Sequence, residues 1–371
     1  MEIIHLILGK ANPERMNGVN KVVFGMASHQ ESFGEKVMVW GITKDKEKNY
    51  PDRNFETRLF LKSKNPFGIS TELKNAILEK KDKAIFHFHG GWIPVYYTLS
   101  KFLNKHSIPF VVTPHGAYNA IAMKKSQWLK KIYYSFFEKN MLRKASKIHC
   151  LGQSELDNTA TLFESDKAIL IPYGYESNLK NIACESKDES QFIFGFIGRL
   201  DIYTKGLDKL IDGFQNFFDT HPNARLWMIG DSDEKEVLKK MIEERNLTNK
   251  VVFFGSKFGK QKETLLKNID VFVHPSRNEG LPASVIEAAS FGKPCLVSKA
   301  TNIGEMIQEY NAGKMIDEVA SNTIATAMEE LYMLSLQKED FKKMGHNAIK
   351  MIKENFNWNK IIHDYKTQLY Q

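Results

Sequence analysis

The chain has 371 residues, of which 42% are hydrophobic and 26% charged, and it carries a formal net charge of +8. This is ordinary globular composition without a low-complexity block or a repeat of fixed period, so a disordered or solenoid protein is excluded. The length suits two domains of roughly 150 to 200 residues each. The positive charge favours an acidic partner, which could be nucleic acid, an anionic membrane or a phosphorylated small molecule.

The cysteines and the apolar runs indicate the compartment. Cys150, Cys184 and Cys295 lie far apart and none forms a C-x-x-C pair, so we expect reduced thiols and no structural zinc site. The start, MEIIHLILGK, lacks a basic region and a cleavage site, so it predicts a first strand rather than a signal peptide. No run approaches the ~18 apolar residues of a membrane-spanning helix. We therefore expect a cytoplasmic protein.

Apolar runs alternate with amphipathic stretches from the start of the chain, which is typical of βαβ units. In the first half the runs are IIHLIL, AIFHFH, PFVVTP, KIHC and AILIPYGYE. A polar stretch at 177–190 predicts an interdomain linker. The pattern restarts with FIFGFIG and continues through RLWMIG, VVFFG and DVFVHP. We predict two parallel-sheet α/β domains, over 1–178 and 190–355, and an amphipathic terminal helix over 356–371.

Two acids, Glu279 and Glu287, lie eight positions apart among small and apolar residues. Proline suits the first turn of a helix and Gly292 its end, so we predict a helix from about Pro282 to Phe291 between the strands VFVHP and PCLVS. The loop before such a helix favours diphosphate, and a carboxylate about 7 Å further along suits a diol such as ribose. The alternative is a buried structural glutamate and an exposed loop glutamate, and the spacing does not decide between them.

A glycine loop with two cations follows the first strand of the second half. Gly198 and Arg199 leave the strand, and Lys205 with Gly206 precedes a helix. Glycine lets the backbone approach a ligand, arginine can contact phosphate with two N–H groups, and lysine adds a point charge. The alternative is a glycine turn with two solvated cations, and the loop alone does not exclude it.

Five segments occur in an order that is more specific than any one of them. They are GRLDIYTKGLD, IGDSDE, VVFFGS, HPSRNEGLPASVIEAASFGKPCLVS and TNIGEMI. Together they resemble glycosyltransferase family 4, whose members have the GT-B fold of two Rossmann-like domains facing a cleft, and the E-x7-E element of Glu279 and Glu287 is the strongest part. The resemblance covers the C-terminal half and continues more weakly through FHFHGGW, TPHGAYN and ILIPYGYE. The tail with Trp358 is similar to the family's terminal helix, which crosses back to the first domain.

The resemblance implies a retaining glycosyltransferase that uses a nucleotide-diphosphate sugar, with the acceptor bound by the first domain and the donor mainly by the second. Arg199 and Lys205 match the family's diphosphate-binding positions. Glu287 matches the ribose-binding position, and Glu279 the first acid, near the donor sugar and the diphosphate. The two acids would then hold the two ends of the donor.

The resemblance also implies a mechanism. Gly280 and Leu281 would offer backbone N–H groups to the distal phosphate and the sugar. We reject double displacement by the two acids, because a glutamate that holds ribose is several Å from the anomeric carbon. The expectation is front-face attack, in which a donor phosphate oxygen helps to deprotonate the acceptor hydroxyl. Neither a metal ion nor a cofactor is expected.

In the first half, His115 in TPHGAYN follows a strand and matches a family histidine near the donor sugar and the catalytic centre. A lone histidine is often structural, but the strand-end position and the motif favour function. His89 in HFHGG also ends a strand, and there we favour simple burial of the ring. Gly18 in RMNGVNKVV matches the family's donor-binding glycine loop, with one glycine where the family has two. The candidate catalytic residues are His115, Arg199, Lys205 and Glu279.

Two further stretches have alternative interpretations. Asp231-Ser232-Asp233 mimics the D-x-D metal motif, but it follows a strand and begins a helix, so we favour capping by Ser232 or Asp231 over metal binding. Residues 124–147 form a basic amphipathic segment, which can lie on an anionic membrane or pack on the core with a solvated lysine face. We favour the membrane, hence a peripheral location on the inner face of the cytoplasmic membrane. Its basic and apolar residues are Lys124, Lys125, Lys130, Lys131, Lys139, Arg143, Lys144, Lys147, Trp128, Leu129, Ile132, Tyr133 and Phe136.

We therefore expect an enzyme that transfers a hexosyl or N-acetylhexosaminyl group to a glycan or lipid-linked glycan in cell-surface polysaccharide or lipopolysaccharide synthesis. One alternative is another GT-B enzyme, such as a sugar-nucleotide epimerase. The other is a basic protein that binds nucleic acid or membrane and keeps the fold without catalysis. This last alternative predicts loss of the site residues, which are all present, so we expect no nucleic-acid partner.

Overall fold

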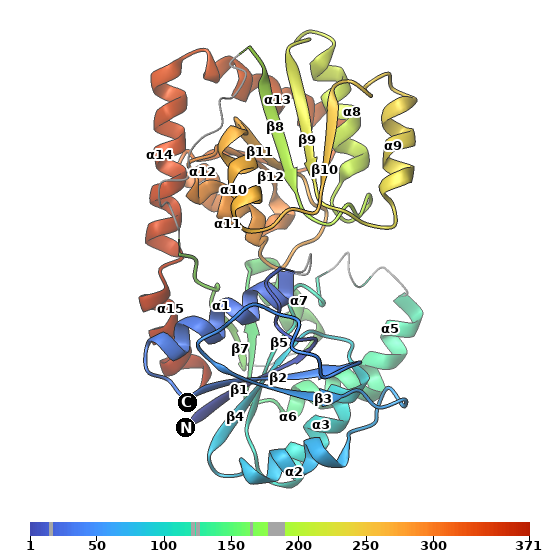
Figure 1. The fold of residues 1–371 in the computed structure, drawn as a ribbon, viewed down its shortest axis with the longest axis vertical. Coiled ribbons are helices and arrows are strands. Elements are labelled where there is room, and N and C mark those ends of the chain that lie inside the picture. The colour runs from blue at the N-terminus through green and yellow to red at the C-terminus, as the bar shows by residue number, and fades with distance from the viewer. Residues whose placement is uncertain (15–17, 120–122, 124–126, 164–165, 177–189) are drawn as a thin grey trace. The chain divides into compact units, whose positions relative to one another are not determined.

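The computed structural model describes residues 1–14, 18–119, 123, 127–163, 166–176 and 190–371. The chain forms two compact units, of which the first is Met1–Gly174 with Trp358–Gln371 and the second is Tyr175–Asn357. Each unit contains one parallel sheet with helices around it (Figure 1). The prediction of two Rossmann-like parallel-sheet units is confirmed. The predicted linker, apart from Ser190, lies outside the described residues.

The sheet of the first unit has seven strands in the order β3-β2-β1-β4-β5-β6-β7. Their bounds are β1 Glu2–Leu8, β2 Val37–Thr43, β3 Glu56–Leu61, β4 Ala84–His89, β5 Phe110–Thr113, β6 Lys147–Cys150 and β7 Ala168–Leu170. The register of the central strands places Leu6 opposite Trp40 and Phe88, and all three are fully buried. Helices on both faces bury the sheet, so both faces of its central strands are buried, and His5, His87 and His89 lie among the apolar residues of β1 and β4.

The helices of the first unit come from both ends of the chain. Their bounds are α1 Gly18–Ser32, α2 Thr71–Glu79, α3 Pro94–Lys105, α5 Gln127–Tyr133, the π-helical turn η1 Tyr134–Glu138, α6 Lys139–Lys144, α7 Gln153–Leu162, α15 Trp358–Asp364 and the π-helical turn η3 Tyr365–Leu369. The tail packs on this unit. The Trp358 ring stacks on His29 with centroids 4.4 Å apart, and the Tyr365 hydroxyl donates to the carbonyl of Pro172 at 3.2 Å.

The sheet of the second unit has six strands in the order β10-β9-β8-β11-β12-β13. Their bounds are β8 Phe192–Ile197, β9 Ala224–Ile229, β10 Val251–Gly255, β11 Val271–His274, β12 Cys295–Ser298 and β13 Gly313–Ile316. Phe194, Phe196 and Phe214 are fully buried in its core. The strands predicted from RLWMIG, VVFFG and DVFVHP are confirmed.

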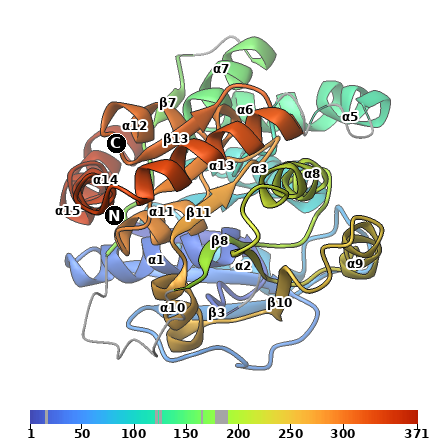
Figure 2. The same cartoon turned by 90° about the horizontal axis from the view of Figure 1, so that it is seen from above.

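The helices of the second unit surround this sheet. Their bounds are α8 Leu207–Phe218, α9 Lys235–Glu243, α10 Gly259–Asn268, α11 Ala283–Ser290, the 3-10 turn η2 Lys299–Thr301, α12 Gly304–Glu309, α13 Ser321–Ser335 and α14 Lys338–Asn355. α8 packs on α13, and α11 packs on α14 (Figure 2). Pro282 caps the start of α11 and Phe291 its end, so the predicted helix is confirmed to within a residue at each end.

Candidate active site

The strand order of the second unit determines where a ligand can bind. From β8 the chain builds outward through β9 and β10, and it then returns to the other side of β8 with β11, β12 and β13. The order therefore reverses between β8 and β11, and open α/β sheets bind ligands at the carboxyl ends of the strands at such a point. Arg199 and Lys205 follow β8, and Glu279 follows β11. The fold thus places three of the candidate residues on the two loops that flank the reversal.

Glu279 is the centre of a buried polar cluster. Its Oε1 accepts from Lys205 Nζ, from His274 Nε2 at 2.7 Å and from Ser276 Oγ at 3.0 Å. Burial raises the pKa of Glu279, but Lys205 and His274 outweigh it and hold the pKa well below 4.5. Burial lowers the pKa of His274, so a neutral imidazole donates Nε2–H. Glu279 is therefore a fixed anion at neutral pH.

The loop that carries Glu279 is fastened to the next strand. Asn302 Nδ2 donates to the carbonyl of Glu279 at 3.0 Å and to that of Gly280 at 2.6 Å. Ser298 Oγ donates to the carbonyl of Ser276. Both donors lie at or just after the end of β12. Gly280 and Leu281 thus lie on a held loop between the acid and the start of α11.

Glu287 forms a second acid–cation pair. It lies on the buried side of α11, and its Oε1 is 2.7 Å from Lys262 Nζ on α10, with only 8% of the Glu287 side chain and 14% of the Lys262 side chain exposed. Charges this deeply buried are stable only when paired and hydrogen-bonded. Lys262 was not among the residues singled out from the sequence. It lies 25 positions before Glu287 on another helix, so no local pattern links the two residues.

Arg199 differs from Lys205, Glu279 and Glu287 because its side chain is exposed. Its Nη2 is 2.7 Å from Asp201 Oδ2, and 59% of its side chain is accessible. Gly206, at φ +68°, ends the loop, and a Cβ there would lie 2.2 Å from the carbonyl oxygen of Pro275. The glycine therefore lets the loop after β8 approach the loop after β11, where Lys205 meets Glu279.

Sequence reasoning also missed three side chains that shape the site. His274 and Ser276 lie inside the quoted HPSRNEGLP motif, and Asn302 lies in TNIGEMI. Their signal is proximity to the first acid in the motif, together with their position at the ends of β11 and β12. The structure brings Lys205 and Glu279 into direct contact. Glu287 and Arg199 have other partners.

In the first unit, His115 follows β5 and adopts φ +56°. A left-handed conformation is uncommon for a residue other than glycine and is often retained at functional sites. The next backbone N–H, that of Gly116, donates to the buried carboxylate of Glu155. Burial lowers the pKa of His115 to about 3, so the ring is neutral. Gly18 is the exposed first residue of α1, and the rest of its predicted loop, 15–17, lies outside the described residues.

Three buried histidines are the described residues that could share a metal ion. The ligand atoms of His5, His87 and His89 lie within 4.8 Å of one another. Every ring nitrogen of these residues already takes part in a hydrogen bond, with partners 2.5 to 3.0 Å away. No carboxylate takes part in these bonds to balance a cation, so hydrogen bonding explains the cluster better than a metal does. The predicted burial of the His89 ring is confirmed.

The predicted capping of a helix by Ser232 or Asp231 is wrong. α9 begins at Lys235, and its N-cap residue Glu234 makes no side-chain cap. Ser232 Oγ instead accepts from the N–H of Glu234 at 3.1 Å and donates to the carbonyl of Leu200 at 2.8 Å. These bonds close a turn before the helix and connect it to the loop after β8.

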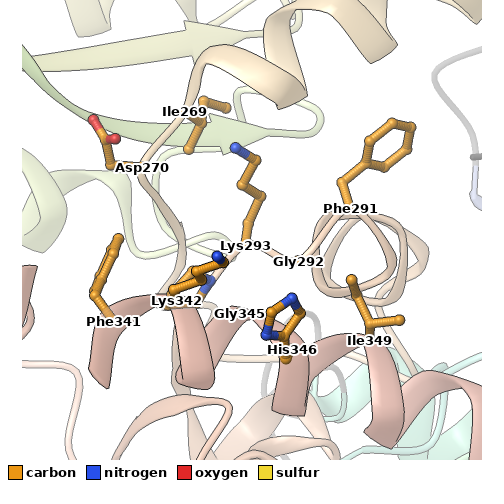
Figure 3. A pocket seen from close by; sticks show the side chains of 11 residues that line it. Ile269, Asp270, Phe291, Gly292, Lys293, Phe341, Lys342, Gly345, His346 and Ile349 are labelled. Carbon is orange, nitrogen blue, oxygen red and sulfur yellow. The ribbon is translucent and has the colours of Figure 1, made fainter. Parts of the chain in front are cut away.

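A pocket of about 270 Å³ lies elsewhere in the second unit (Figure 3). It is lined by α14 and by residues that precede β11 and β12, including Asp270 and Lys293. It therefore lies at the amino ends of these strands. The candidate site lies at their carboxyl ends, so the pocket is separate from it.

Comparison with known proteins bears on the whole chain. A family model described as Glycosyltransferase Family 4 matches residues 16–178, and one described as Glycosyl transferases group 1 matches residues 179–351. An uncharacterized glycosyltransferase of Methanocaldococcus jannaschii is 26% identical over 266 residues, which are 68% of this chain and 65% of the relative. The aligned part therefore spans just under two thirds of that relative.

A longer alignment and a solved structure agree with this assignment. The GDP-mannose:cellobiosyl-diphosphopolyprenol alpha-mannosyltransferase of Xanthomonas campestris is 22% identical over 98% of this chain and 95% of its own. Anabaena HepE, solved with UDP and glucose, matches 100% of this chain and 99% of its own with a TM-score of 0.77 and 16% identity, and it supports the GT-B fold. The chain belongs to glycosyltransferase family 4.

Proposed function

We propose that the chain transfers a hexosyl or N-acetylhexosaminyl group, with retention at the anomeric carbon, from a nucleotide-diphosphate sugar to a hydroxyl of a glycan or lipid-linked glycan in cell-surface polysaccharide or lipopolysaccharide synthesis. The observation that carries the proposal is the pair of buried acid–cation contacts in the second unit, Lys205–Glu279 and Lys262–Glu287. One lies at the loop that flanks the reversal of strand order, and the other lies within the helix that follows that loop. This arrangement suits a ligand with a diphosphate at one end and a diol at the other.

Each charged residue has a role in this proposal. The exposed guanidinium of Arg199 and the ammonium of Lys205 neutralise the diphosphate as it leaves, so no metal ion is needed. Glu279 shares the Lys205 ammonium with the diphosphate and keeps it in place. Glu287 accepts hydrogen bonds from the ribose diol, and Lys262 balances its charge. The backbone N–H groups of Gly280 and Leu281 face the distal phosphate and the sugar, and His115 and Gly18 contribute from the first unit.

The charge state of Glu279 excludes it as a general acid, and the mechanism that we propose is front-face attack. A general acid must be protonated at the working pH, and Lys205 with His274 holds the pKa of Glu279 well below 4.5. Glu279 therefore cannot protonate a leaving group. A nucleotide diphosphate neutralised by cations leaves without such help, and a donor phosphate oxygen accepts the proton of the acceptor hydroxyl.

The relatives support the substrate classes. The Xanthomonas enzyme is named for a GDP-mannose donor and a diphosphopolyprenol-linked acceptor, and Anabaena HepE was solved with UDP and glucose. GDP-mannose is a nucleotide-diphosphate sugar, and HepE was also solved with such a sugar, UDP-glucose. One acceptor is lipid-linked, which agrees with the acceptor class proposed for this chain.

The decisive experiment is a thermal-shift series with UDP-, GDP-, ADP- and dTDP-sugars, each with and without EDTA. A ligand at a hundred times its Kd adds about 2.7 kcal/mol to the free energy of unfolding, which is easily visible. We expect one nucleotide class to stabilise the protein, with or without EDTA, and Glu287→Ala and the isosteric Glu287→Gln to abolish the shift. The matched control is Asp208→Asn, which breaks the bidentate Arg277–Asp208 pair of the same unit and should keep the shift. If no nucleotide sugar shifts the melting temperature, or if the protein instead binds oligonucleotides in a salt-dependent way, the proposal is wrong.

We also propose that the basic segment contacts an anionic membrane. Its alternative was a helix packed on the core, but the side chains of Trp128, Leu129, Ile132 and Phe136 are 56 to 78% exposed. The exposed ammonium of Lys131 lies over the Trp128 ring at 5.3 Å. Exposed large apolar side chains beside lysines suit a surface of acyl chains and anionic headgroups. No described helix has the length and apolarity that crossing a bilayer requires. Lys124 and Lys125 lie outside the described residues.

Vesicle co-sedimentation tests this contact. We expect binding to vesicles with one third phosphatidylglycerol, and loss of binding when Trp128, Leu129 and Ile132 are replaced by serine. The matched control replaces Met333 and Leu336, which are similarly exposed on and beside α13, and should bind as the wild type does. Equal binding by all three proteins, or no binding by the wild type, refutes the membrane contact.

A further inference from the structure

A chain of hydrogen bonds in the core of the first unit has a direction that the structure determines. His149 Nε2 lies 2.7 Å from the carbonyl oxygen of Ile171, which can only accept, so His149 carries its proton on Nε2. Its Nδ1 must then accept from the Thr113 hydroxyl at 2.8 Å. Having donated its proton, the Thr113 oxygen accepts from His87 Nε2 at 2.5 Å. His87 Nδ1 in turn accepts from the Tyr370 hydroxyl at 2.8 Å.

Gln30 connects this chain to a second one. Burial raises the pKa of both Tyr370 and Glu35, and the Gln30 side chain opposes that rise in each. An amide opposes it with its N–H2 end, because only a donor stabilises an anionic oxygen. The Gln30 nitrogen lacks a partner of normal hydrogen-bond geometry among the described residues, and Tyr370 and Glu35 are its neighbours. The Gln30 oxygen Oε1 faces His5 and lies 2.7 Å from its Nε2.

The second chain runs from this oxygen to the end of β5. Because the Gln30 oxygen can only accept, His5 carries its proton on Nε2, and its Nδ1 accepts from His89 Nε2 at 2.8 Å. His89 Nδ1 then accepts from His115 Nε2 at 3.0 Å. With its proton on Nε2, His115 presents an unprotonated Nδ1. Within the part of the chain that the structure describes, Nδ1 of His115 has no hydrogen-bond partner.

We propose that this network holds His115 in the tautomer with an unprotonated Nδ1, so that the residue accepts a hydrogen bond from a hydroxyl of the bound sugar, and that Gln30 is a positioning residue for that interaction. The inference rests on the proposed function for the identity of the ligand. The opposite tautomer would present an N–H group, which can only donate. A hydroxyl can pair with either tautomer, so the network sets the direction of that bond, and it excludes a phosphate or carbonyl oxygen as the partner of His115 Nδ1.

The surroundings keep the network neutral. Burial lowers the pKa of His5 and His149 to about 4, that of His115 to about 3, and those of His87 and His89 well below 6.5. Each histidine would also repel a charge on its neighbours, since the five rings lie 4.2 to 5.7 Å apart in successive pairs. The other titratable groups that face the network are Glu35, Tyr370 and Tyr365. None of the histidines holds a second proton near neutral pH, so a single tautomer can be maintained.

The test reads the tautomers directly by long-range 1H–15N correlation spectra of protein labelled with 15N-histidine, with signals assigned from single histidine variants. We expect Nε2–H at His5, His87, His89, His115 and His149. Gln30→Met keeps the shape of the side chain but removes the acceptor, so His115 should become a mixture of tautomers. Gln30→Glu keeps an acceptor for His5 and should restore Nε2–H at His115. A wild-type His115 with Nδ1–H, or an unchanged His115 in Gln30→Met, would falsify the inference.

Kinetics provides the second readout. A neutral hydrogen bond contributes a few-fold to about tenfold in an equilibrium or rate constant, so Gln30→Met should lower kcat/KM about three- to tenfold and Gln30→Glu should recover it. The affinity for the nucleoside diphosphate alone should be unchanged. The matched control is Ser100→Ala, at a buried serine of the same unit whose hydroxyl, among the described residues, bonds to the carbonyl of Tyr97 and to no other group. This variant should keep wild-type kinetics. The spectra need no turnover, so a failed donor-binding test with the expected tautomers refutes the proposed function, whereas donor binding with the wrong tautomer refutes the network.

Discussion

Replacing Glu279 with glutamine removes the charge on which three donors converge, and its cost can be estimated. Glutamine keeps the shape and an acceptor for His274, but it leaves the Lys205 ammonium, whose side chain is 17% exposed, without its anion. Breaking a buried ion pair from one side costs about 3 to 5 kcal/mol. The remaining exposure lets water reach both groups, so we expect about 3 kcal/mol, at the lower end of that range. In Lys205→Met/Glu279→Gln no charge is left unpaired, and we expect the double variant to regain about 1 to 2 kcal/mol of the summed losses.

The assay must report on the second unit alone, because a chain of two units need not unfold in one step. Amide hydrogen exchange of the peptide that contains β11, Val271–His274, meets that need, since its slowest exchange follows the opening of that sheet. Asp208→Asn is the reference, because it breaks a pair in the same unit without touching Glu279. Additive losses in the double variant, or a Glu279→Gln protein as stable as the wild type, would refute the argument that Lys205 depends on Glu279.

Three further outcomes follow from the described geometry. Arg199→Met should change the free energy of unfolding by less than about 0.5 kcal/mol, because the side chain is 59% exposed. The same change should weaken nucleotide-sugar binding about tenfold or more, as measured by calorimetry. An unchanged affinity would exclude a contact between Arg199 and phosphate. Gly206→Ala should lower the free energy of unfolding in urea by about 2 to 3 kcal/mol, because a Cβ there meets the carbonyl oxygen of Pro275. Gly255→Ala is the control, since Gly255 has nearly the same φ but open space around the Cβ, and it should lower the free energy by only about 1 kcal/mol. Equal losses would contradict the close approach of the two loops. The first unit should lose stability as the pH falls from about 6.5 to 4, because the unfolded chain protonates the five network histidines first. This loss outweighs the opposite effect of three carboxyl groups whose pKa values burial raises, Glu35 and, to about 7, Glu138 and Glu155. Hydrogen exchange of β4 at both pH values measures the change, and greater protection at the lower pH would contradict it.

The sequence predicts the neighbourhood of the two acids well because its signals are local. Pro282, the small residues after it and Gly292 specify a helix within a dozen positions, and the flanking apolar runs specify the strands. The partner of Glu287 was not predictable in this way. Lys262 lies on a different helix, and only the packing of α10 beside α11 brings it to the carboxylate.

The histidine network is a second example of non-local structure. The sequence predicts burial of the His89 ring, but it does not indicate His5 and His149 as members of the network. The register that pairs His5 with His87 across β1 and β4 depends on the order of the strands in the sheet. The prediction of helix capping by Ser232 or Asp231 was wrong for a different reason. Ser232 bonds to the carbonyl of Leu200, and because of this tertiary contact it lies in a turn before the helix.

The first unit is assembled from both ends of the chain, and this has a consequence during synthesis. Domains generally fold as they emerge from the ribosome, starting from the N-terminus. The strands of this unit emerge early. Trp358, which covers Gly174 and stacks on His29, and Tyr370, which bonds to His87, emerge only after the whole second unit. The second unit can therefore be complete while the first still lacks part of its core. Until the tail arrives, the nascent first unit exposes the surface that the tail later covers, and the hydrogen-bond direction that ends at His115 is established only after Tyr370 has emerged.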